Sequence, residues 1–380
     1  MIKIDNMSKV FKDAVYLPMS LLIIFCSDGT STNESNSIEG LTLPPGFVIT
    51  EFAQNLGKAR GMGISPAGVL FVCSLDSGEI IALPDRDSDG KADDKIVFAQ
   101  GLKSPHSVTF FNGYIYVGES DKISRFRDDN NDLIADAAGE TVVAGLPTSG
   151  HFTKTVVFGP DNMMYVSIGS SCNVCEESDP RRAAVVRYDQ DGGSETIFSS
   201  GLRNSVALAF HPESGELWAA NNGRDRIGDD LPPEEINILS EGKHYGWPYC
   251  YGDENMNPEY ENDPSLCDET ISPVFDMQAH SAPLGMRFYG GSQFPVEYRG
   301  DLFIGFHGSW NRTKKTGYKV VRVRVEDGLP VSIEDFVSGW LLVDETRWGR
   351  PVDIEFSPDG SMFVSDDYRG IVYKISYTGG

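Results

Sequence analysis

Apolar and polar residues alternate in short runs along most of this chain, and turn residues separate the runs. Residues 155–158 (TVVF) lead into a Gly-Pro-Asp-Asn turn at 159–162, and residues 164–166 (MYV) lead out of it. Alternation with a period of two, bounded by turn residues, predicts a β-hairpin. Helical periodicity is almost absent from the rest of the sequence, so the pattern favours an all-β protein.

One unit of this pattern recurs six times: a glycine, alternating apolar residues, a turn, and an apolar-aromatic-valine run. The copies begin at residues 61, 101, 150, 201, 284 and 349. Six copies at this spacing predict a six-bladed β-propeller that forms one cooperative domain. A two-sheet sandwich is the alternative fold, but it explains six matched repeats poorly. Residues 224–283 are too many for a simple turn, and long propeller loops gather on one face, where function usually lies.

The N-terminal segment lies outside the repeat. Two lysines precede an apolar stretch at 14–25 that is too short to span a bilayer, and Cys26 and a polar run follow it. This arrangement predicts a signal peptide at 1–26, a flexible polar tether at 27–40 and the propeller at 41–380. A cysteine in this place resembles a bacterial lipoprotein signal, although the phenylalanine before it is a poor match. We expect export to the periplasm or cell surface, and lipidation of Cys26 stays open.

Acidic residues outnumber basic ones by 56 to 32, which gives a formal net charge of -24. Such a surface repels phosphate backbones and anionic lipid head groups, so it argues against nucleic acid as a partner. The acidic surface does not repel neutral ligands such as sugars. Contact with a membrane is expected only through the lipid anchor on Cys26, if that anchor is present.

Five further cysteines fit an oxidising compartment. Cys172 could close a small loop with Cys175, and Cys250 could pair with Cys267 across an acidic excursion. Cys73 lies in a strand-like stretch and is expected to be a buried thiol. A zinc site at the single CxxC is weakly supported, because no second pair of ligands has suitable spacing.

Two loops place carboxylates at alternating positions, which is how oxygen ligands surround calcium. The first loop contains Asp85, Asp87, Asp89 and Asp93, and the second contains Asp128, Asn130, Asp132 and Asp136. Neither loop has the terminal glutamate of an EF-hand. An acidic, solvated β-turn explains each loop equally simply, so calcium is an expectation for the first set and an open question for the second.

Histidines stand in loops beside several predicted strands, at positions 151, 244, 280 and 307. A general base must be held at the substrate with a suitable pKa, and histidine meets that need. Each of these histidines taken alone is also explained as a hydrogen-bonded loop residue. Spacing by itself therefore does not decide whether His151, directly ahead of the third repeat, is catalytic.

Seven motifs in order resemble the PQQ-dependent glucose/sorbosone dehydrogenase family. They are GHFTKTVVFGPD, SIGSSCN, GLRNSVALAFHP, NNGRDRIGDDLPPEEIN, GKHYGWP, HGSWNRTKKTGYKVVRV and GRPVDIEFSPDG. Members of that family are six-bladed propellers that use pyrroloquinoline quinone (PQQ) and calcium. The likeness spans about residues 40–377, and SSCN and HGSWNR resemble the sorbosone and aldose sugar branch more than the glucose branch.

The resemblance implies roles for individual residues. His151 would be the base that takes the hydroxyl proton at the anomeric carbon while hydride passes to C5 of the quinone. Arg203 and Asn204 would contact PQQ, with Arg203 stabilising negative charge on the quinone oxygen. Arg350 would bind the PQQ carboxylates. Residues aligned with less certainty to the cofactor pocket are His280 and His307.

The resemblance also implies two places for calcium. The backbone carbonyls of Gly223 and Arg224 would hold a PQQ-bound ion that polarises the quinone carbonyl as a Lewis acid. Glu234 and Glu235 fall near a further calcium site of the family. One departure is Ser170, which stands where the glucose-type enzymes carry an aspartate that orients the base, and a serine cannot supply that charge.

We therefore expect an exported PQQ- and calcium-dependent dehydrogenase that oxidises an aldose or related aldehyde sugar such as sorbosone. Its electrons would pass to a separate acceptor, a quinone or a cytochrome, because the sequence has no CxxCH for a c-type haem. Two alternatives are a calcium-dependent propeller hydrolase of the lactonase type and a non-catalytic propeller that binds sugars or proteins. The sequence does not name the sugar, the acceptor or the oligomeric state.

Overall fold

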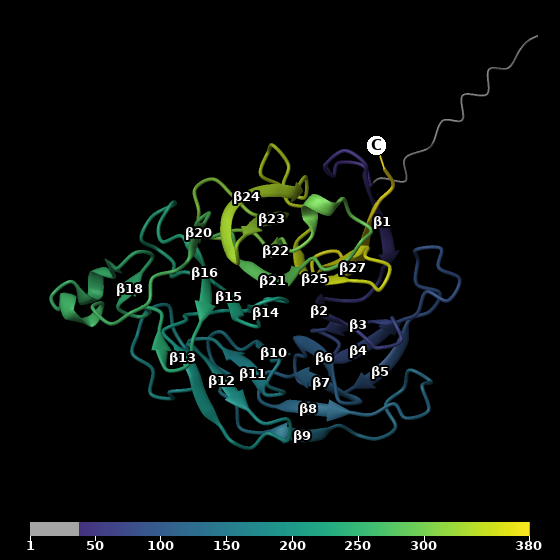
Figure 1. The fold of residues 1–380 in the computed structure, drawn as a ribbon, viewed down its shortest axis with the longest axis horizontal. Coiled ribbons are helices and arrows are strands. Elements are labelled where there is room, and N and C mark those ends of the chain that lie inside the picture. Colours follow the sequence, from purple (N-terminus) through teal and green to yellow (C-terminus); the bar gives the residue numbers. More distant parts are fainter. Residues whose placement is uncertain (1–37, 380) are drawn as a thin grey trace, which may run out of the picture. The chain divides into compact units, whose positions relative to one another are not determined.

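Each copy of the repeat begins one antiparallel sheet in the computed structural model, which describes residues 38–379. The predicted signal peptide at 1–26, its Cys26 and most of the tether at 27–40 lie outside the described residues. Six sheets surround a common axis, as Figure 1 shows. The all-β, six-bladed propeller predicted from the repeats is therefore confirmed.

The strands of the first two sheets follow one another directly along the chain, and the third sheet adds one short strand from later in the sequence. The first sheet holds β2 (Ala59–Ile64), β3 (Leu70–Ser74), β4 (Glu79–Leu83) and β5 (Ile96–Gln100). The second holds β6 (Ser107–Phe111), β7 (Tyr114–Gly118), β8 (Ile123–Phe126) and β9 (Glu140–Val143). The third holds β10 (Lys154–Phe158), β11 (Met164–Ile168), β12 (Ala184–Tyr188), β13 (Thr196–Ser200) and the short parallel β17 (Lys243–His244).

The last three sheets contain one insertion and one strand from the opposite end of the chain. The fourth sheet holds β14 (Ala207–Phe210), β15 (Leu217–Asn221), β16 (Glu234–Leu239) and β20 (Phe275–Met277). The fifth holds β21 (Pro283–Phe288), β22 (Leu302–Phe306), β23 (Lys319–Glu326) and β24 (Leu329–Val337). The sixth holds β25 (Pro351–Phe356), β26 (Met362–Asp366), β27 (Ile371–Tyr377) and, as its outer strand, β1 (Phe47–Ala53).

The first strands of the six sheets form a closed circle of contacts. β2 contacts β6, and the circle continues through β10, β14, β21 and β25 back to β2. Glycines allow this close approach: a Cβ on Gly61 would lie 2.0 Å from the His106 carbonyl oxygen, and one on Gly63 would lie 2.6 Å from that of Val108. The cavity left on the axis measures only about 20 Å³ and is lined by all six first strands.

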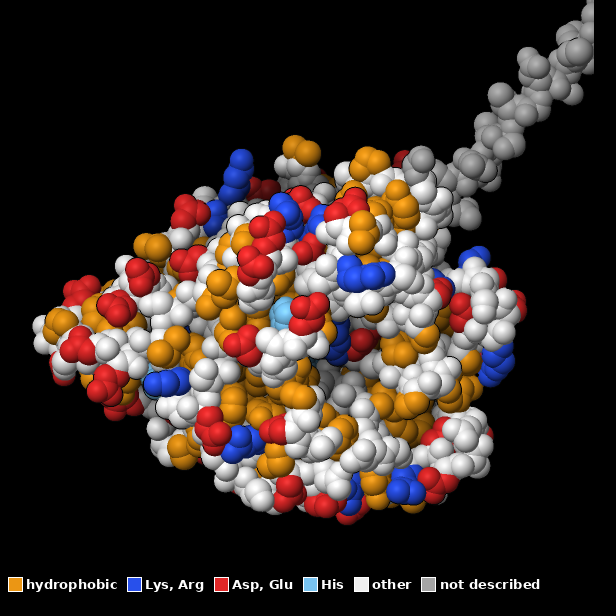
Figure 2. Space-filling model, viewed as in Figure 1, with side chains coloured by type: hydrophobic (Ala, Val, Ile, Leu, Met, Phe, Trp, Pro, Cys, Tyr) orange, Lys and Arg blue, Asp and Glu red, His pale blue; other side chains and the backbone are white. Residues whose placement is uncertain are grey.

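Apolar side chains fill the space between each pair of neighbouring sheets. Six hydrophobic clusters lie around the axis, one for every pair of neighbours. Strand residues such as those of β11 are buried throughout, because both faces of an inner strand are covered. This explains why the repeats show continuous apolar runs as well as simple alternation. Figure 2 shows one face of this body, where hydrophobic side chains lie around a hollow near its centre.

The long interval between the fourth and fifth repeats holds β16 and a projection stapled by a disulfide. The projection contains a small hairpin and two 3-10 helices: β18 (Cys250–Tyr251), β19 (Asn255–Met256), η1 (Pro258–Tyr260) and η2 (Pro264–Leu266). A third 3-10 helix, η3 (Val296–Tyr298), precedes β22. None of the helices among the described residues is long and apolar enough to cross a membrane.

The expected cysteine chemistry is confirmed. Cys172 is bonded to Cys175, and Cys250 is bonded to Cys267. Cys73, in β3, is the one free cysteine among residues 38–379, and it is buried.

Strand direction determines where loop side chains lie. In every sheet the second strand runs antiparallel to the first, so the residues before the first strand lie beside those after the second. We call the face that carries these segments the site face. It brings together the loops ahead of β2, β6, β10, β14, β21 and β25.

We predict that Ile49→Ala in β1 lowers the free energy of unfolding by about 2–5 kcal/mol, because it leaves a cavity where β1 closes the ring. Ile49 is fully buried between the fifth and sixth sheets. Urea denaturation measures the change. Val343→Ala is the control, because Val343 is fully exposed and its truncation should change the free energy by no more than about 0.5 kcal/mol. Equal effects of the two variants would contradict the importance of ring closure.

Candidate active site

His151 lies in the segment that leads into β10, and Ser170, which follows β11, lies against it. The His151 backbone N–H donates to the Ser170 carbonyl at 2.9 Å, and Nδ1 lies 3.1 Å from that carbonyl oxygen and 3.0 Å from the Ser170 Oγ. Gly169 permits this packing, since a Cβ there would lie 2.5 Å from the His151 Cβ. The pairing of β10 with β11 thus orients the imidazole.

The surroundings of His151 keep its imidazole neutral. Burial, followed by the positive charges of Arg203 and Arg182, lowers the pKa of His151 to about 4, although the bond to Ser170 opposes this shift. A neutral imidazole has a nitrogen lone pair that can take a proton at neutral pH. His151 therefore has the state that a general base requires.

Arg203, which precedes β14, is buried, and all three of its guanidinium nitrogens donate hydrogen bonds within the protein. Its Nε donates to the Asn173 carbonyl at 3.1 Å and its Nη1 to the Gly223 carbonyl at 2.8 Å. Its Nη2 donates to Asn173 Oδ1 at 3.0 Å and forms an ion pair with Asp225 at 3.1 Å. The next residue, Asn204, has its Oδ1 beside Gly169, where an added Cβ would lie 2.6 Å from it. His151, Arg203 and Asn204 therefore share one part of the site face.

Hydrogen bonds connect His151 to Arg350 across four sheets. Ser170, which contacts His151, donates its N–H to the Arg203 carbonyl at 2.8 Å, and Arg203 donates to Gly223. The connection continues from Gly223 through Glu234 and Ala282 to His307, whose carbonyl accepts from Arg350 Nε at 3.2 Å. Four of the predicted residues, His151, Arg203, His307 and Arg350, therefore belong to one connected arrangement.

The remaining part of the site face carries a second group of charges. His307 Nε2 lies 2.8 Å from Asp367 Oδ1, and Arg60 Nη1 forms an ion pair with Asp367 Oδ2 at 2.7 Å. Arg60 Nη2 lies 3.4 Å from His106 Nε2. Within the described residues, the buried Arg60 Nε and His106 Nδ1 have no hydrogen-bond partner.

The histidines of this group are neutral and its aspartate is ionised. Burial lowers the pKa of His307 to about 4, against the effect of Asp367. Burial, with the charge of Arg60 next, lowers the pKa of His106 well below its usual value. Although burial opposes it, hydrogen bonding to His307 and the charge of Arg60 lower the pKa of Asp367. Asp367 therefore carries a negative charge close to the guanidinium groups of Arg60 and Arg350.

His280 is outside the connected arrangement. It precedes β21 and is buried, and its Nε2 lies 2.9 Å from the Gly228 carbonyl oxygen. Its φ of 63° places it in the left-handed region that few side chains adopt. Its role in a cofactor pocket stays a prediction. His244 has a structural partner instead, because its Nδ1 accepts from the Gly246 N–H at 3.2 Å.

The residues predicted near calcium lie together at the end of β15 and in β16. Glu234 is buried and accepts backbone N–H groups from Gly223 at 2.6 Å and Ala282 at 3.0 Å. Glu235 is buried and accepts from the Gly252 N–H and from the side chain of Asn221. Arg224 forms an ion pair with Glu259. Both glutamates thus hold loops of the site face in place, and metal ligation by them stays a prediction.

The first aspartate loop is preformed in part. Asp85, Asp87 and Asp89 place carboxylate oxygens within 4.8 Å of one another. Asp93 is outside this group and accepts the Arg86 backbone N–H at 2.6 Å. The second loop repeats these contacts, since Asp136 accepts the Asp129 N–H at 2.7 Å. Calcium binding by either loop stays a prediction.

Residues 41–378 match the family described as TrAA12-like. The chain belongs to the TrAA12-like family. This match covers nearly all of the described residues, so it includes the six sheets and every segment of the site face.

Relatives of this TrAA12-like chain include sugar dehydrogenases. An uncharacterized protein of Borreliella burgdorferi is 31% identical over 98% of this chain and 99% of its own length. The aldose sugar dehydrogenase YliI of Escherichia coli is 30% identical over 61% of this chain and 61% of its own length. A PQQ-dependent pyranose dehydrogenase of Coprinopsis cinerea is 23% identical over 88% of this chain but only 54% of its own length.

Solved structures of PQQ proteins share the fold of the TrAA12-like chain. The holo PQQ domain of the Coprinopsis cinerea pyranose dehydrogenase superposes with a TM-score of 0.77, at 21% identity, over 90% of this chain and 98% of that one. The PQQ-bound aldose sugar dehydrogenase of Streptomyces coelicolor gives a TM-score of 0.64, at 19% identity, over 88% of this chain and 99% of that one. The resemblance to the PQQ-dependent sugar dehydrogenases, inferred from the motifs, is confirmed.

Sequence reasoning missed three residues of the site face in this TrAA12-like chain: Arg60, His106 and Asp367. Arg60 and His106 stand close to the start of a first strand, as do His151, Arg203 and Arg350. Alignment of the six repeats on this position would have revealed both residues. Asp367 follows a second strand, which is the place of Ser170 in its own sheet.

We predict that removing His151 changes the pH dependence of stability. Between pH 6.5 and pH 4 the unfolded chain takes up a proton at His151 that the folded chain does not. The wild type should therefore lose up to about 3 kcal/mol relative to His151→Gln as the pH falls through this range, and no more below it. Denaturant unfolding at several pH values measures this difference. A constant difference between pH 7 and pH 4 would contradict the neutral state assigned to His151.

Proposed function

We propose that this protein oxidises an aldose or related aldehyde sugar, such as sorbosone, with PQQ and calcium. The observation that carries the proposal is His151: a neutral, oriented imidazole on the site face, linked through Ser170 to the buried Arg203. Membership of the TrAA12-like family and the named relatives that are sugar dehydrogenases support the same function.

The charges of the site face fit PQQ, which is a planar quinone with three carboxylates. Arg60, Arg203 and Arg350 come from three different sheets. The unpartnered Nε of Arg60 and Nδ1 of His106 are buried donors with which carboxylate oxygens could pair. Asn204, His307 and His280 would complete the pocket. When bound, PQQ would supply the electron acceptor for the hydride that leaves the sugar.

The protein side chains would perform the remaining steps. His151 would take the proton from the hydroxyl group of the sugar at its free ring nitrogen. Arg203 would stabilise negative charge that develops next to it, because it is buried and already held rigidly by Asn173 and Asp225. Together these groups would remove the proton and stabilise the negative charge that develops as hydride leaves the sugar.

Calcium would be held by oxygen ligands, as a hard divalent cation requires. The Gly223 carbonyl accepts from Arg203 through one lone pair and keeps a second one for a cation. The Arg224 carbonyl is the other proposed ligand, and Glu234 and Glu235 lie directly behind this loop. The loop of Asp85, Asp87 and Asp89 is a second proposed site, with Asp93 supporting it through Arg86.

We also propose that the protein acts outside the cytoplasm, with residues 1–26 as its signal peptide and residues 27–40 as a tether. The two disulfides support this proposal, because disulfides persist in oxidising compartments. Lipidation of Cys26 would place the propeller at a membrane surface. A separate quinone or cytochrome would then receive the electrons.

Reconstitution tests the function. Purified protein is loaded with PQQ and calcium and given a panel of aldoses and sorbosone with an artificial electron-accepting dye. We predict dye reduction that requires PQQ and falls roughly 100-fold or more in His151→Ala, because general base catalysis contributes on that order. The sugar that gives the largest kcat/KM identifies the substrate.

His211→Asn is the matched control. His211 lies in the β14–β15 turn, at the opposite ends of these strands from Arg203, and Asn keeps an acceptor for the Ser214 N–H that His211 Nδ1 binds. This variant should keep wild-type activity. Lactone hydrolysis with calcium alone would support the lactonase alternative, and sugar binding without dye reduction would support a non-catalytic propeller. Either result would overturn the dehydrogenase proposal.

A further inference from the structure

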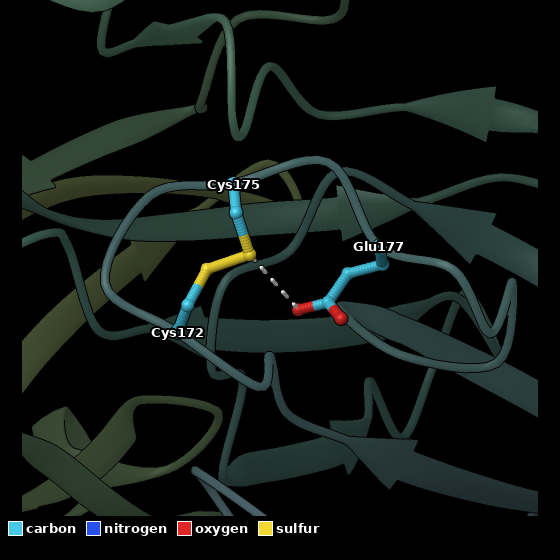
Figure 3. A group of neighbouring side chains, drawn as sticks. All are labelled: Cys172, Cys175 and Glu177. Carbon is cyan, nitrogen blue, oxygen red and sulfur yellow. Dashed lines mark hydrogen bonds between the residues drawn. A yellow bond between two sulfur atoms is a disulfide. The ribbon is translucent and has the colours of Figure 1, made fainter.

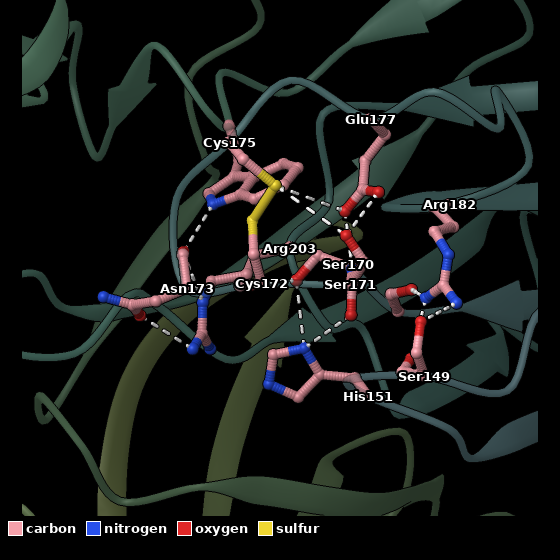
Figure 4. Close-up of a disulfide and its surroundings, with 12 residues drawn as sticks. Ser149, His151, Ser170, Ser171, Cys172, Asn173, Cys175, Glu177, Arg182 and Arg203 are labelled. Atoms are coloured by element: carbon pink, nitrogen blue, oxygen red, sulfur yellow. Dashed lines mark hydrogen bonds between the residues drawn. A yellow bond between two sulfur atoms is a disulfide. The ribbon is translucent and has the colours of Figure 1, made fainter.

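A short loop closed by the Cys172–Cys175 disulfide lies beside His151 and Arg203, as Figure 4 shows. It follows Ser170 and contains Asn173 as its first internal residue. Ser170 contacts the imidazole of His151, and Asn173 contacts the guanidinium of Arg203. The loop and the serine that leads into it therefore contact both residues to which the proposed reaction assigns chemistry.

The hydroxyl group of Ser170 can only accept a hydrogen bond from His151. Ser170 Oγ lies 2.7 Å from the Cys172 carbonyl oxygen, so its single proton is donated there. Towards the imidazole, Ser170 therefore offers two acceptors: its Oγ at 3.0 Å and its carbonyl oxygen at 3.1 Å. Two acceptors facing Nδ1 require the proton to be on Nδ1. Nε2 consequently carries the lone pair.

Asn173 holds Arg203 from two sides. Its carbonyl accepts from Arg203 Nε at 3.1 Å and from Trp247 Nε1 at 3.1 Å, and its Oδ1 accepts from Arg203 Nη2 at 3.0 Å. The same side chain pairs with the backbone of Asp225, whose N–H donates to Oδ1 at 2.8 Å and whose carbonyl accepts from Nδ2 at 3.1 Å. Arg203 and its partner Asp225 are thus fixed relative to each other by one asparagine.

The disulfide and Glu177 hold the loop in this shape. Glu177 accepts the Ser171 N–H at 2.6 Å and the Ser171 hydroxyl at 2.8 Å. Figure 3 shows its carboxylate next to Cys175. The two sulfur atoms are bonded to each other, so this group of Cys172, Cys175 and Glu177 has no thiolate to offer a metal ion. Its function is to position the loop.

We propose that Ser170 and Asn173, held by the Cys172–Cys175 disulfide, are positioning residues: Ser170 sets the His151 tautomer that leaves Nε2 unprotonated, and Asn173 fixes the orientation of Arg203. The two neutral oxygen atoms of Ser170 then orient the His151 imidazole. A carboxylate in their place would orient it too, but would also add a negative charge. The charged groups that face His151 are the guanidinium groups of Arg203 and Arg182. The catalytic consequence rests on the proposed function, but the tautomer does not.

The tautomer can be measured on the protein without any cofactor. Histidine labelled with ¹⁵N gives different chemical shifts for protonated and unprotonated ring nitrogens, and His151→Asn identifies the signals of His151. We expect Nδ1 to be protonated and Nε2 unprotonated at pH 7. A proton on Nε2 would overturn the proposal, whether or not the protein oxidises sugars.

Ser170→Asp provides a charge test. A carboxylate against Nδ1 should raise the pKa of His151 in the NMR titration by roughly 1–3 units, which is the usual effect of an adjacent opposite charge. An unchanged titration would show that residue 170 does not face Nδ1 and would overturn the role of Ser170. If this variant fails to fold, the wild-type tautomer still decides the question.

The two disulfides provide a matched pair for the loop itself. In the Cys172→Ser/Cys175→Ser variant we expect signals of both His151 tautomers, because the Cys172 carbonyl is no longer held against Ser170. The Cys250→Ser/Cys267→Ser variant removes a disulfide from the projection and should leave His151 in one tautomer. A single unchanged tautomer in the first variant would overturn the role of the disulfide.

Asn173→Ala tests the second half of the proposal. In PQQ-loaded protein we expect kcat to fall roughly 10-fold or more with little change in the KM of the sugar, since a misplaced Arg203 loses charge stabilisation in the transition state. Asn112→Ala, at an exposed turn between β6 and β7, is the control. Wild-type kcat in Asn173→Ala would overturn the role of Asn173. A wild-type protein that oxidises no sugar would instead refute the proposed function and leave the NMR results valid.

Discussion

The antiparallel pairing of β1 with β27 is the constraint on which the rest of this structure depends. It joins residues 47–53 to residues 371–377 and completes the sixth sheet with a strand from the other end of the chain. Without β1 the sixth sheet would keep only three strands, whereas each of the other five has at least four. Because every hydrophobic cluster lies between two sheets, ring closure also completes the clusters on both sides of the sixth sheet.

Closure of the ring gives the site its geometry. Each sheet contributes one short segment before its first strand and one after its second, and six such pairs meet around the axis. Several charged and polar side chains of these segments bond to neighbours from an adjacent sheet. Arg60 and Asp367 are 307 residues apart, yet they form one ion pair.

The sequence was sufficient for the fold, and it predicted part of the connected arrangement on the site face. Six repeats in the correct phase predicted six sheets, and His151, Arg203 and Arg350 were found because motifs surround them. Arg60, His106 and Asp367 were missed because their partners are distant in sequence and no motif links them. Burial was the other quantity that the sequence concealed: Glu234 and Glu235 resemble metal ligands in an acidic run, yet each is buried and bonded to amide groups.

The small cavity on the axis limits which molecules can pass through the propeller. At about 20 Å³ it has room for a water molecule and not for a sugar, because glycines let the first strands approach closely. The depression of about 380 Å³ at the opposite ends of these strands is therefore not a second exit for a molecule bound on the site face. The axis of the propeller therefore offers no passage for a molecule of the size of a sugar. A product would have to leave through the opening that the next substrate uses, so release and uptake would follow each other in strict turn.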